Sequence, residues 1–366
     1  MSGPAPYRSA GVDYDVLDQA KKLALRAVKS TLTAPGMRGA SVLPETIGDP
    51  AQVLEVDGVV LATVLECLGT KSTIAYEVER ELGLDRWRDV GTDTVAAVVN
   101  DLCCVGALPL SLSAYVATGS ADWYSGERHA SLVEGFRAAC ESTGAAWVGG
   151  ESPTLAGIVT AEGVDLAGSS IGRLPPGRPV WLGSRIEAGD EIVLVASGGL
   201  HANGASLARA AARAEPLGWA TPLRSGRLLG EAVLDPSALY VGLVAALHDS
   251  SAKVHYATHI SGHGWRKLMR AERALTYRLR SVMAVPEVLA YLATAAGLDD
   301  SGAYGTFNMG AGFALFVAAG SGDEAARIAR ACGHEALVAG GVEDGPRSVV
   351  IEPLEVRYGG DELDLR

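Results

Sequence analysis

Polar side chains that could perform chemistry lie inside apolar or glycine-rich stretches of this sequence. In chain order they are Glu66, Thr70, Lys71, Asp93, Asn100, Asp101, Glu151, Asp165, His201, Asn203, His259 and Asn308. A buried carboxylate is costly unless a cation, a metal ion or backbone N–H groups accompany it. Because Mg2+ takes oxygen ligands and accompanies nucleotide phosphates, the pattern predicts a magnesium–nucleotide site.

The hexapeptide ECLGTK, from Glu66 to Lys71, joins the apolar run VVLATVL to the segment STIAYEVERELG, which has helical spacing. A carboxylate, a glycine turn, a hydroxyl and a lysine at the end of a strand are suited to hold an anion. The hexapeptide matches no standard phosphate-binding loop. It is therefore an anion-site hypothesis that needs support from the rest of the chain.

Each of these residues also has a structural interpretation. Glu66 could end a strand at the surface, Asp93 could cap a helix, and Asn100 with Asp101 could lie on a solvated helix face. The stretch GGLHANG, which holds His201 and Asn203, could be only a strand-to-helix turn. For any single residue the structural role is at least as probable as the functional one, so only the ordered set carries weight.

Composition limits the possible functions. The chain has 366 residues, 48% of them hydrophobic and 20% charged, which favours two globular domains. Its net charge of -12 opposes nucleic-acid binding, so an anionic ligand needs a locally positive site. The five cysteines form no CxxC pair, which indicates reduced, mostly buried thiols. We expect no signal peptide and no membrane span.

Strands and helices alternate along both halves, which predicts an α/β or α+β fold. In the first half we expect helices over 12–32, 93–107 and 125–144, and one after Lys71. Strands are expected at 110–119, 145–152 and 163–174, with a hairpin turning at Asp57-Gly58. The Pro- and Gly-rich stretch after residue 174 places a domain boundary near 175, giving domains 1–175 and 176–366.

The second half continues the alternation. Strands are expected at 191–197, 310–320, 334–345 and 348–354, and helices at 205–215, 287–297 and 323–333. The last twelve residues, EVRYGGDELDLR, are polar enough to be expected as a surface tail.

Taken in order, the motifs resemble the aminoimidazole ribonucleotide synthetase family, which comprises the phosphoribosylformylglycinamidine cyclo-ligases. The resemblance begins at YRSAGVD (Tyr7 to Asp13) and continues through GTKSTIAYE, GTDTVAAVVNDLCCVGALPL, YVATG, GGES and DLAGSSIG. It resumes with SGGLHANGASLAR, HISGHG and TFNMGAG. It covers nearly the whole chain, and although one such motif would be weak, the ordered set is specific.

The resemblance implies an ATP-dependent ring closure in which a formamide oxygen is phosphorylated and an internal nitrogen then attacks the activated carbon. Such catalysis consists mainly of positioning and charge stabilisation of the phosphoryl group. It also implies a cytoplasmic homodimer whose N-terminal strands form a barrel across the subunit interface. The expected ligands are ATP, Mg2+ and a small-molecule substrate.

The resemblance also implies a role for each matching residue. Gly69, Thr70 and Lys71 would hold the nucleotide phosphates, with Asp93, Asn100 and Glu151 beside them. Asp93, Asp101 and Glu66 would bring magnesium. Asp165, His201, Asn203, His259 and Asn308 would line the substrate side. Lys71, His201 and Asp101 would take part in catalysis, with His201 either carrying a proton or donating to the ribose phosphate.

The sequence departs from the family pattern at several of these places. Glu66 replaces an aspartate, Cys67 a glycine, and His263 and Trp265 a glycine and a small aliphatic residue. The loop TLTAPGMRGASVLPE replaces a stretch rich in arginine and glycine. We expect Cys67 to be a solvent-shielded, inert thiol. Two other hypotheses therefore stay open: a paralogue that activates another amide, and a catalytically silent nucleotide-binding subunit.

Overall fold

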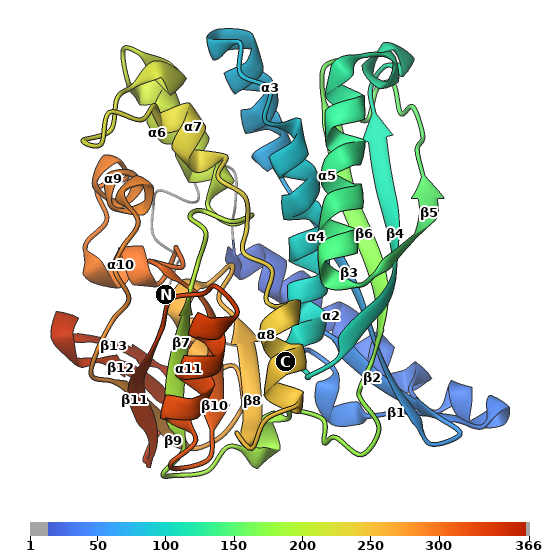
Figure 1. The fold of residues 1–366 in the computed structure, drawn as a ribbon, viewed down its shortest axis with the longest axis vertical. Helices are drawn as coiled ribbons and strands as arrows, with labels where there is room; N and C mark the ends of the chain where they lie inside the picture. Colours follow the sequence, from blue (N-terminus) through green and yellow to red (C-terminus); the bar gives the residue numbers. More distant parts are fainter. Residues whose placement is uncertain (1–13, 364–366) are drawn as a thin grey trace.

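The computed structural model describes residues 14–363 of the chain, without the side chains of residues 14–19, 21 and 22. The expected motif Tyr7 to Asp13 and the last residues, 364–366, lie outside the described part. Two sheets, each with its own helices, make up the molecule (Figure 1).

The first half of the chain supplies four helices and six strands among the described residues. The helices are α2 (Tyr14–Thr31), α3 (Lys71–Leu82), α4 (Trp87–Cys103) and α5 (Glu127–Thr143). The strands are β1 (Ala40–Val42), β2 (Gln52–Val56), β3 (Val59–Cys67), β4 (Leu108–Thr118), β5 (Ala146–Glu151) and β6 (Val164–Arg173).

These six strands form one sheet in the order β1-β2-β3-β6-β4-β5, in which only β4 and β5 run parallel. The predicted hairpin joins β2 to β3, and Asp57 and Gly58 have φ values of 50° and 78°, as a two-residue hairpin turn requires. Helix α4 packs on one face. The other face exposes apolar side chains, including Leu65 and Ile171.

Helices α4 and α5 lie unusually close because a glycine on each helix faces the backbone of the other helix. A Cβ at Gly91 would come within 2.5 Å of the Leu132 oxygen, and one at Gly135 within 2.0 Å of the Arg88 oxygen. This close packing fixes α4, and α4 carries several of the predicted site residues.

The second half forms a seven-stranded sheet in the order β13-β12-β9-β11-β7-β10-β8. Its strands are β7 (Glu191–Ala196), β8 (Val254–His259), β9 (Leu275–Leu279), β10 (Ala311–Val317), β11 (Ala336–Asp344), β12 (Ser348–Ile351) and β13 (Val356–Gly359). The helices are α6 (Ala205–Ala214), α7 (Leu229–Val233), α8 (Val241–His248), α9 (Glu287–Ala295), α10 (Asp300–Tyr304) and α11 (Gly322–Ala331).

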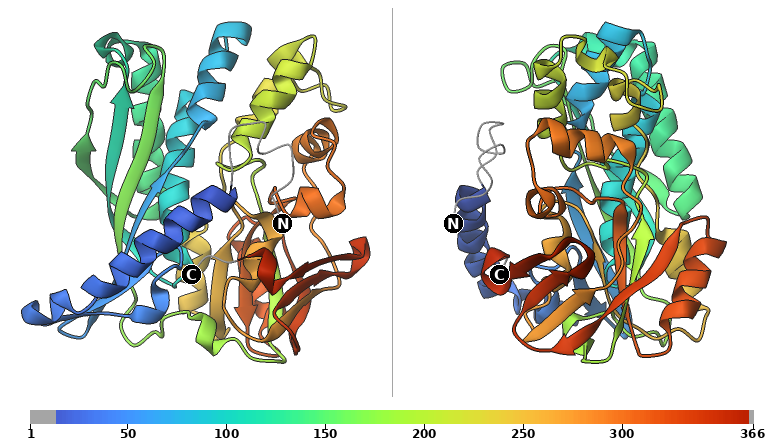
Figure 2. Two further views of the ribbon diagram at one scale, coloured as in Figure 1. Left: turned by 180° about the vertical axis from the view of Figure 1, so that it is seen from behind. Right: turned by 90° about the vertical axis from the view of Figure 1, so that its left-hand side faces the viewer.

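The two halves pack against each other along α4 and α3. Helix α4 contacts both α8 and β8, while α3 contacts α6 and α7 (Figures 1 and 2). Figure 2 shows from behind that α3 and α6 stand side by side above the second sheet. The chemistry-bearing residues of α4 are therefore presented to the second half.

The predicted mixed α/β fold is confirmed. The expected surface tail is wrong, because residues 356–359 form β13, which pairs with β12 and buries Val356 and Tyr358. The barrel across a homodimer concerns a second chain and stays a prediction, as does the domain division near residue 175. Within residues 14–363, no helix combines the length and apolar character that crossing a membrane requires.

Candidate functional site

A pocket of about 790 Å3 lies where the two halves meet. One side is formed by the loop that ends β3, from Glu66 to Thr70, and by Asp101 on α4. The other side is formed by the start of α6 and by the turn that follows β8, from His259 to Arg270. Six predicted site residues line it: Glu66, Gly69, Thr70, Asp101, Asn203 and His259.

Two helices begin at this pocket. Thr70 is the N-cap of α3 and Gly204 is the N-cap of α6. The Thr70 and Ser206 hydroxyls lie 3.3 Å apart and join the two helix starts. The first N–H groups of a helix have no partner within it and carry partial positive charge, so paired helix starts favour an anion. The pocket is therefore suited to phosphate oxygens despite the acidic chain.

Asp101 and His259 form a hydrogen-bonded pair in the pocket. The His259 Nδ1 and Asp101 Oδ1 atoms lie 2.9 Å apart. Burial acts to raise the pKa of Asp101, but the hydrogen bond and charge of His259 outweigh it and hold that pKa below its usual value. Among the described residues, His259 Nε2 is buried without a hydrogen-bond partner. The pair thus presents an oriented imidazole nitrogen.

Glu66 lies on the same wall. Burial, followed by the negative charge of Asp101, raises the pKa of Glu66 to about 7. Two carboxylates that repel each other at a pocket surface are the donor set a divalent cation neutralises. Glu66 and Asp101 therefore fit a magnesium ion.

Two cations of the pocket were not predicted from the sequence. Lys267, in the 3-10 turn η6 (Gly264–Met269), donates a hydrogen bond to the Ser261 hydroxyl. Arg270 donates to the Gly48 carbonyl, and its Nε lies 3.7 Å from Asp49 Oδ1. Burial, followed by the charge of Arg270, lowers the pKa of Lys267 to about 8. The available signal was KLMR, which places two cations three residues apart and begins three residues after Gly264.

We use the name pocket wall for five of the titratable side chains that line the cavity. They are Glu66, Asp101, His259, Lys267 and Arg270.

Lys71 and Asp93 do not line the pocket. The Lys71 Nζ and Asp93 Oδ2 atoms lie 2.6 Å apart, and both side chains are 0% exposed. Lys71 also donates to the Asp235 carbonyl, and Asp93 Oδ1 accepts hydrogen bonds from the Ser237 N–H and hydroxyl. Because every oxygen of Asp93 is engaged in this way, Asp93 does not fit as a metal ligand here.

Asn100, one helical turn before Cys104 on α4, also holds the second half. Its side-chain nitrogen donates to the Ala238 carbonyl at 2.8 Å, and its oxygen accepts from the Tyr240 N–H at 3.0 Å. Both the nitrogen and the oxygen of the amide thus help to fix the segment before α8.

Asn308 and His201 fix the turn between β7 and α6. Asn308 accepts from the Ser197 hydroxyl and donates to the Gly199 carbonyl. His201 Nε2 accepts from the Gly198 N–H at 2.9 Å. Burial, then the charges of His259 and Lys71, lowers the pKa of His201 well below its usual value, so the ring is neutral at pH 7.

We call this second group the buried clamp. Its members are Lys71, Asp93, Asn100, His201 and Asn308, all buried.

Glu151 and Asp165 lie elsewhere. Glu151 ends β5 and Asp165 lies near the start of β6, and both are exposed outside the pocket lining. Neither of them is among the residues that line the pocket.

The departures from the family pattern differ in position. Cys67 lines the pocket and is exposed, so the expectation of a solvent-shielded thiol is wrong. Partial burial, then the charges of Glu66 and Asp165, raises the pKa of Cys67, which keeps the thiol protonated. His263 lines the pocket at a φ of 71°. Trp265 is instead a core residue, 0% exposed, whose Nε1 donates to the Asn308 carbonyl.

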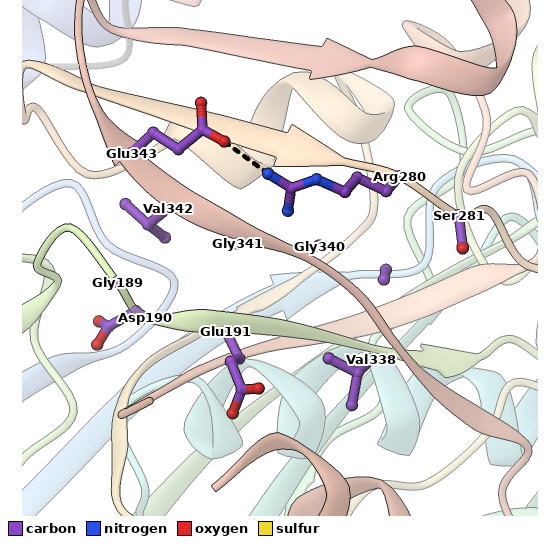
Figure 3. Close-up of a pocket in the computed structure, with 11 residues that line it drawn as sticks. Gly189, Asp190, Glu191, Arg280, Ser281, Val338, Gly340, Gly341, Val342 and Glu343 are labelled. Atoms are coloured by element: carbon purple, nitrogen blue, oxygen red, sulfur yellow. Dashed lines mark hydrogen bonds and ion pairs between the residues drawn. The ribbon is translucent and has the colours of Figure 1, made fainter. Parts of the chain in front are cut away.

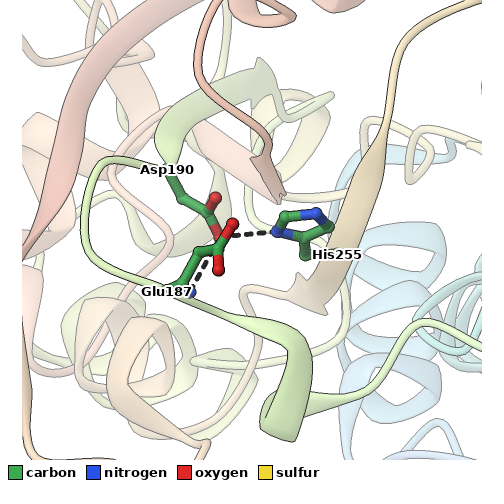
Figure 4. A group of neighbouring side chains, drawn as sticks. All are labelled: Glu187, Asp190 and His255. Carbon is green, nitrogen blue, oxygen red and sulfur yellow. Dashed lines mark hydrogen bonds and ion pairs between the residues drawn. The ribbon is translucent and has the colours of Figure 1, made fainter.

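Two further features lie away from this pocket. Figure 3 shows a recess of about 460 Å3 over β7 and β11, where Arg280 pairs with Glu343. Figure 4 shows Glu187, Asp190 and His255, whose potential ligand atoms lie within 4.8 Å of one another. The Asp190 carboxylate accepts a hydrogen bond from the Glu187 N–H and pairs with His255 Nδ1. These two partners allow the carboxylate to be buried.

Comparison with known proteins matches both halves to one family. Residues 48–174 match the AIR synthase related protein N-terminal domain, and residues 187–352 match the corresponding C-terminal domain.

Several curated relatives carry the same name. A phosphoribosylformylglycinamidine cyclo-ligase from Anaeromyxobacter sp. (strain Fw109-5) is 35% identical over 94% of this chain and 98% of its own length. The protein of that name from Synechococcus elongatus is 30% identical over 94% of this chain and 98% of its own length.

Solved structures share the fold at lower identity. A HypE-HypF complex has a TM-score of 0.59 at 16% identity, covering 86% of this chain and 93% of the other. AaThiL complexed with AMPPCP and TMP has a TM-score of 0.55 at 16% identity, covering 86% and 90%. At such identities the likeness shows the fold alone.

Proposed function

Because the chain belongs to the AIR synthase related protein family, we propose that it is an ATP-dependent cyclo-ligase. It would convert formylglycinamidine ribonucleotide to aminoimidazole ribonucleotide, with ADP and phosphate as the other products. The curated relatives at 28% and 35% identity carry the cyclo-ligase name along almost their full lengths.

The observation that carries this proposal is the pairing of two helix starts with a charged pocket wall. The N–H groups of Gly69 and Thr70, together with those at the start of α6, would bind the nucleotide phosphates. Lys71, which pairs with Asp93, would position this loop from behind rather than contact the phosphates.

Glu66 and Asp101 would hold Mg2+, which neutralises phosphate charge when bound. Asp93 has no such role in this proposal, because Lys71 and Ser237 engage its oxygens.

The substrate side would depend on His259 and Asn203. Asp101 fixes the His259 ring through Nδ1. The Nε2 atom would then be left to accept or return a proton as the internal nitrogen of the substrate attacks and the phosphate leaves. Asn203, on the opposite side of the pocket, would orient the substrate amide. The pocket volume of about 790 Å3 is in the range of small-molecule sites.

The test is product formation by the purified chain. With ATP, Mg2+ and formylglycinamidine ribonucleotide we expect equal amounts of ADP and aminoimidazole ribonucleotide, and we expect the gene to rescue a purine auxotroph that lacks the enzyme. ADP release without a ring-closed product, or no release at all, would reject the proposal.

A second candidate is the same ATP-driven activation of a different amide. The observation in its favour is that Glu66, Cys67 and His263, three departures from the family pattern, all line the pocket. A panel of formamide and amide substrates, assayed for ADP release, distinguishes the two. Release with another amide and none with formylglycinamidine ribonucleotide would favour this candidate.

We further propose that the protein works in the cytoplasm as a homodimer. The open face of the first sheet exposes Leu65 at 74% and Ile171 at 48%, which suits a second copy. Light scattering should give twice the chain mass, and Leu65→Glu with Ile171→Glu should give the monomer.

A further inference from the structure

Lys267 is a buried lysine of the pocket wall whose role is not explained by the fold. Lys267 is only 9% exposed, and its ammonium donates a hydrogen bond to the Ser261 hydroxyl. Lys71, which is also buried, has Asp93 as its partner, and Arg270 is paired with Asp49. Among the residues whose side chains the structure describes, no carboxylate lies within the 4.0 Å ion-pair distance of Lys267.

Glu66 and Asp101 line the same pocket as Lys267 and Arg270, so negative and positive side chains face one cavity. Asp101 pairs with the His259 imidazole. Among the described side chains, no lysine or arginine lies within the 4.0 Å ion-pair distance of either carboxylate. In turn, their charges favour the protonated form of Lys267 against the effects of burial and Arg270.

We propose that Lys267 is the resident counter-ion of Glu66 and Asp101, and that it couples divalent-metal binding to polyphosphate binding. The inference rests on the proposed function for the class of ligand, a metal-bound nucleotide polyphosphate.

The coupling follows from the charges. A divalent cation on Glu66 and Asp101 would share those carboxylates with the Lys267 ammonium, so the two positive groups repel each other and metal binding is weakened. When a polyphosphate enters, its oxygens give the ammonium another partner. The flexible four-carbon stem of lysine allows this change of partner. By linkage, each ligand then tightens the binding of the other by the same factor.

The first test measures metal binding to the full-length protein without nucleotide. Mn2+, whose free concentration is followed by electron paramagnetic resonance, would serve as the probe. We expect Lys267→Met to bind Mn2+ at least tenfold more tightly than the wild type. Lys253→Met removes an exposed lysine with the same charge change and should leave the affinity unaltered. Equal or weaker Mn2+ binding by Lys267→Met would overturn the inference.

The second test measures ATP binding by calorimetry in the presence of EDTA. We expect Lys267→Met to bind metal-free ATP at least tenfold more weakly, since the phosphates lose the ammonium. Lys267→Arg should keep wild-type values in both tests. If Lys267→Met does not fold, Lys267→Gln takes its place, and unchanged Mn2+ and ATP affinities in that variant would also overturn the inference.

These measurements need no turnover, so they separate the inference from the proposed function. Tighter Mn2+ binding by Lys267→Met in a protein that forms no aminoimidazole ribonucleotide would support the counter-ion role and reject the cyclo-ligase. If the wild type shows cyclo-ligase activity but Lys267→Met binds Mn2+ with unchanged affinity, the proposed function is supported and the counter-ion role is rejected.

Discussion

The buried clamp and the pocket wall lie next to each other but use their polar atoms differently. In the clamp, Lys71 meets Asp93 and Asn100 meets two backbone groups across the boundary between the halves. In the wall, His259 Nε2 has no hydrogen-bond partner among the described residues, and Lys267 lines the cavity. His201 Nδ1 of the clamp also has no partner among the described residues, but the other polar groups of the clamp named above are paired within the protein, whereas the wall faces a cavity that a ligand can fill.

This difference shows that burial of a polar group does not identify a catalytic residue. A buried polar group whose partners are all within the protein contributes to stability, and its removal leaves the partner unpaired. A group with atoms turned to a cavity contributes little to folding and much to binding. Substitutions in the two groups should therefore separate stability from activity.

The largest effect is expected for Lys71→Met. The change leaves the Asp93 carboxylate buried without its cation, and breaking a buried pair in this way costs about 3–5 kcal/mol. Urea unfolding followed by tryptophan fluorescence would give the free energy of unfolding. The double variant Lys71→Met with Asp93→Leu is the control, since removing both charges should restore most of the loss. A Lys71→Met variant of unchanged stability would place Lys71 outside the clamp.

The next effect concerns the wall. Asp101→Asn keeps a hydrogen-bond acceptor for His259 but removes the negative charge beside the ring. We expect kcat to fall about a hundredfold, or about 2.7 kcal/mol in barrier height. The free energy of unfolding should change by less than about 1 kcal/mol.

The matched control is Asp93→Asn on the same helix. It should show the reverse pattern, with a loss of stability and, in the fraction that folds, a nearly unchanged kcat. Equal effects of the two substitutions on kcat would remove the distinction between clamp and wall.

A smaller effect is expected for Asn308→Ala. The amide holds the half-buried Ser197 hydroxyl and the buried Gly199 carbonyl, and its loss removes both hydrogen bonds. We expect thermal unfolding to show a loss of about 2 kcal/mol. Asn203→Ala makes the same change at a residue that lines the pocket and serves as the control. It should lower the free energy of unfolding by less than about 0.5 kcal/mol. A larger loss for Asn203→Ala than for Asn308→Ala would contradict the comparison.

Local features of the fold could be predicted from the sequence. The hairpin at Asp57-Gly58 depends on two adjacent residues, and α5 ends at Gly144, which has the left-handed φ of 71° that its glycine allows. Residues 356–359 were missed because β13 is stabilised by pairing with β12. The alternation of Val356 and Tyr358 was the available signal.

The partners of the two lysines could not be predicted, for the same physical reason. Lys71 and Lys267 have the same side chain, and each follows a glycine turn. Their surroundings differ. Asp93 on α4 pairs with Lys71, whereas Lys267 lines an open cavity. Such contacts join residues far apart in the chain, so motif resemblance placed Lys71 at the phosphates and did not mark Lys267.

The smallest effect expected is a change in pH dependence at His201. Its pKa is depressed in the folded protein by burial and by neighbouring positive charge, so below about pH 6.5 the unfolded chain binds a proton that the folded chain does not. Stability is then present above that pH and is lost as the pH falls. Between pH 7 and pH 5.5 this amounts to about 1 kcal/mol.

Replacing His201 by Gln separates this contribution from the others. Glutamine offers an oxygen near the position of Nε2, so the Gly198 N–H keeps an acceptor, but it does not titrate. Burial also lowers the pKa values of His248 and the half-buried His334, and these two contributions are common to both proteins and cancel in the difference. The wild type should therefore lose about 1 kcal/mol more than His201→Gln between pH 7 and pH 5.5. Identical pH profiles would mean that His201 is protonated in the folded state, and His201 would then belong with the pocket wall.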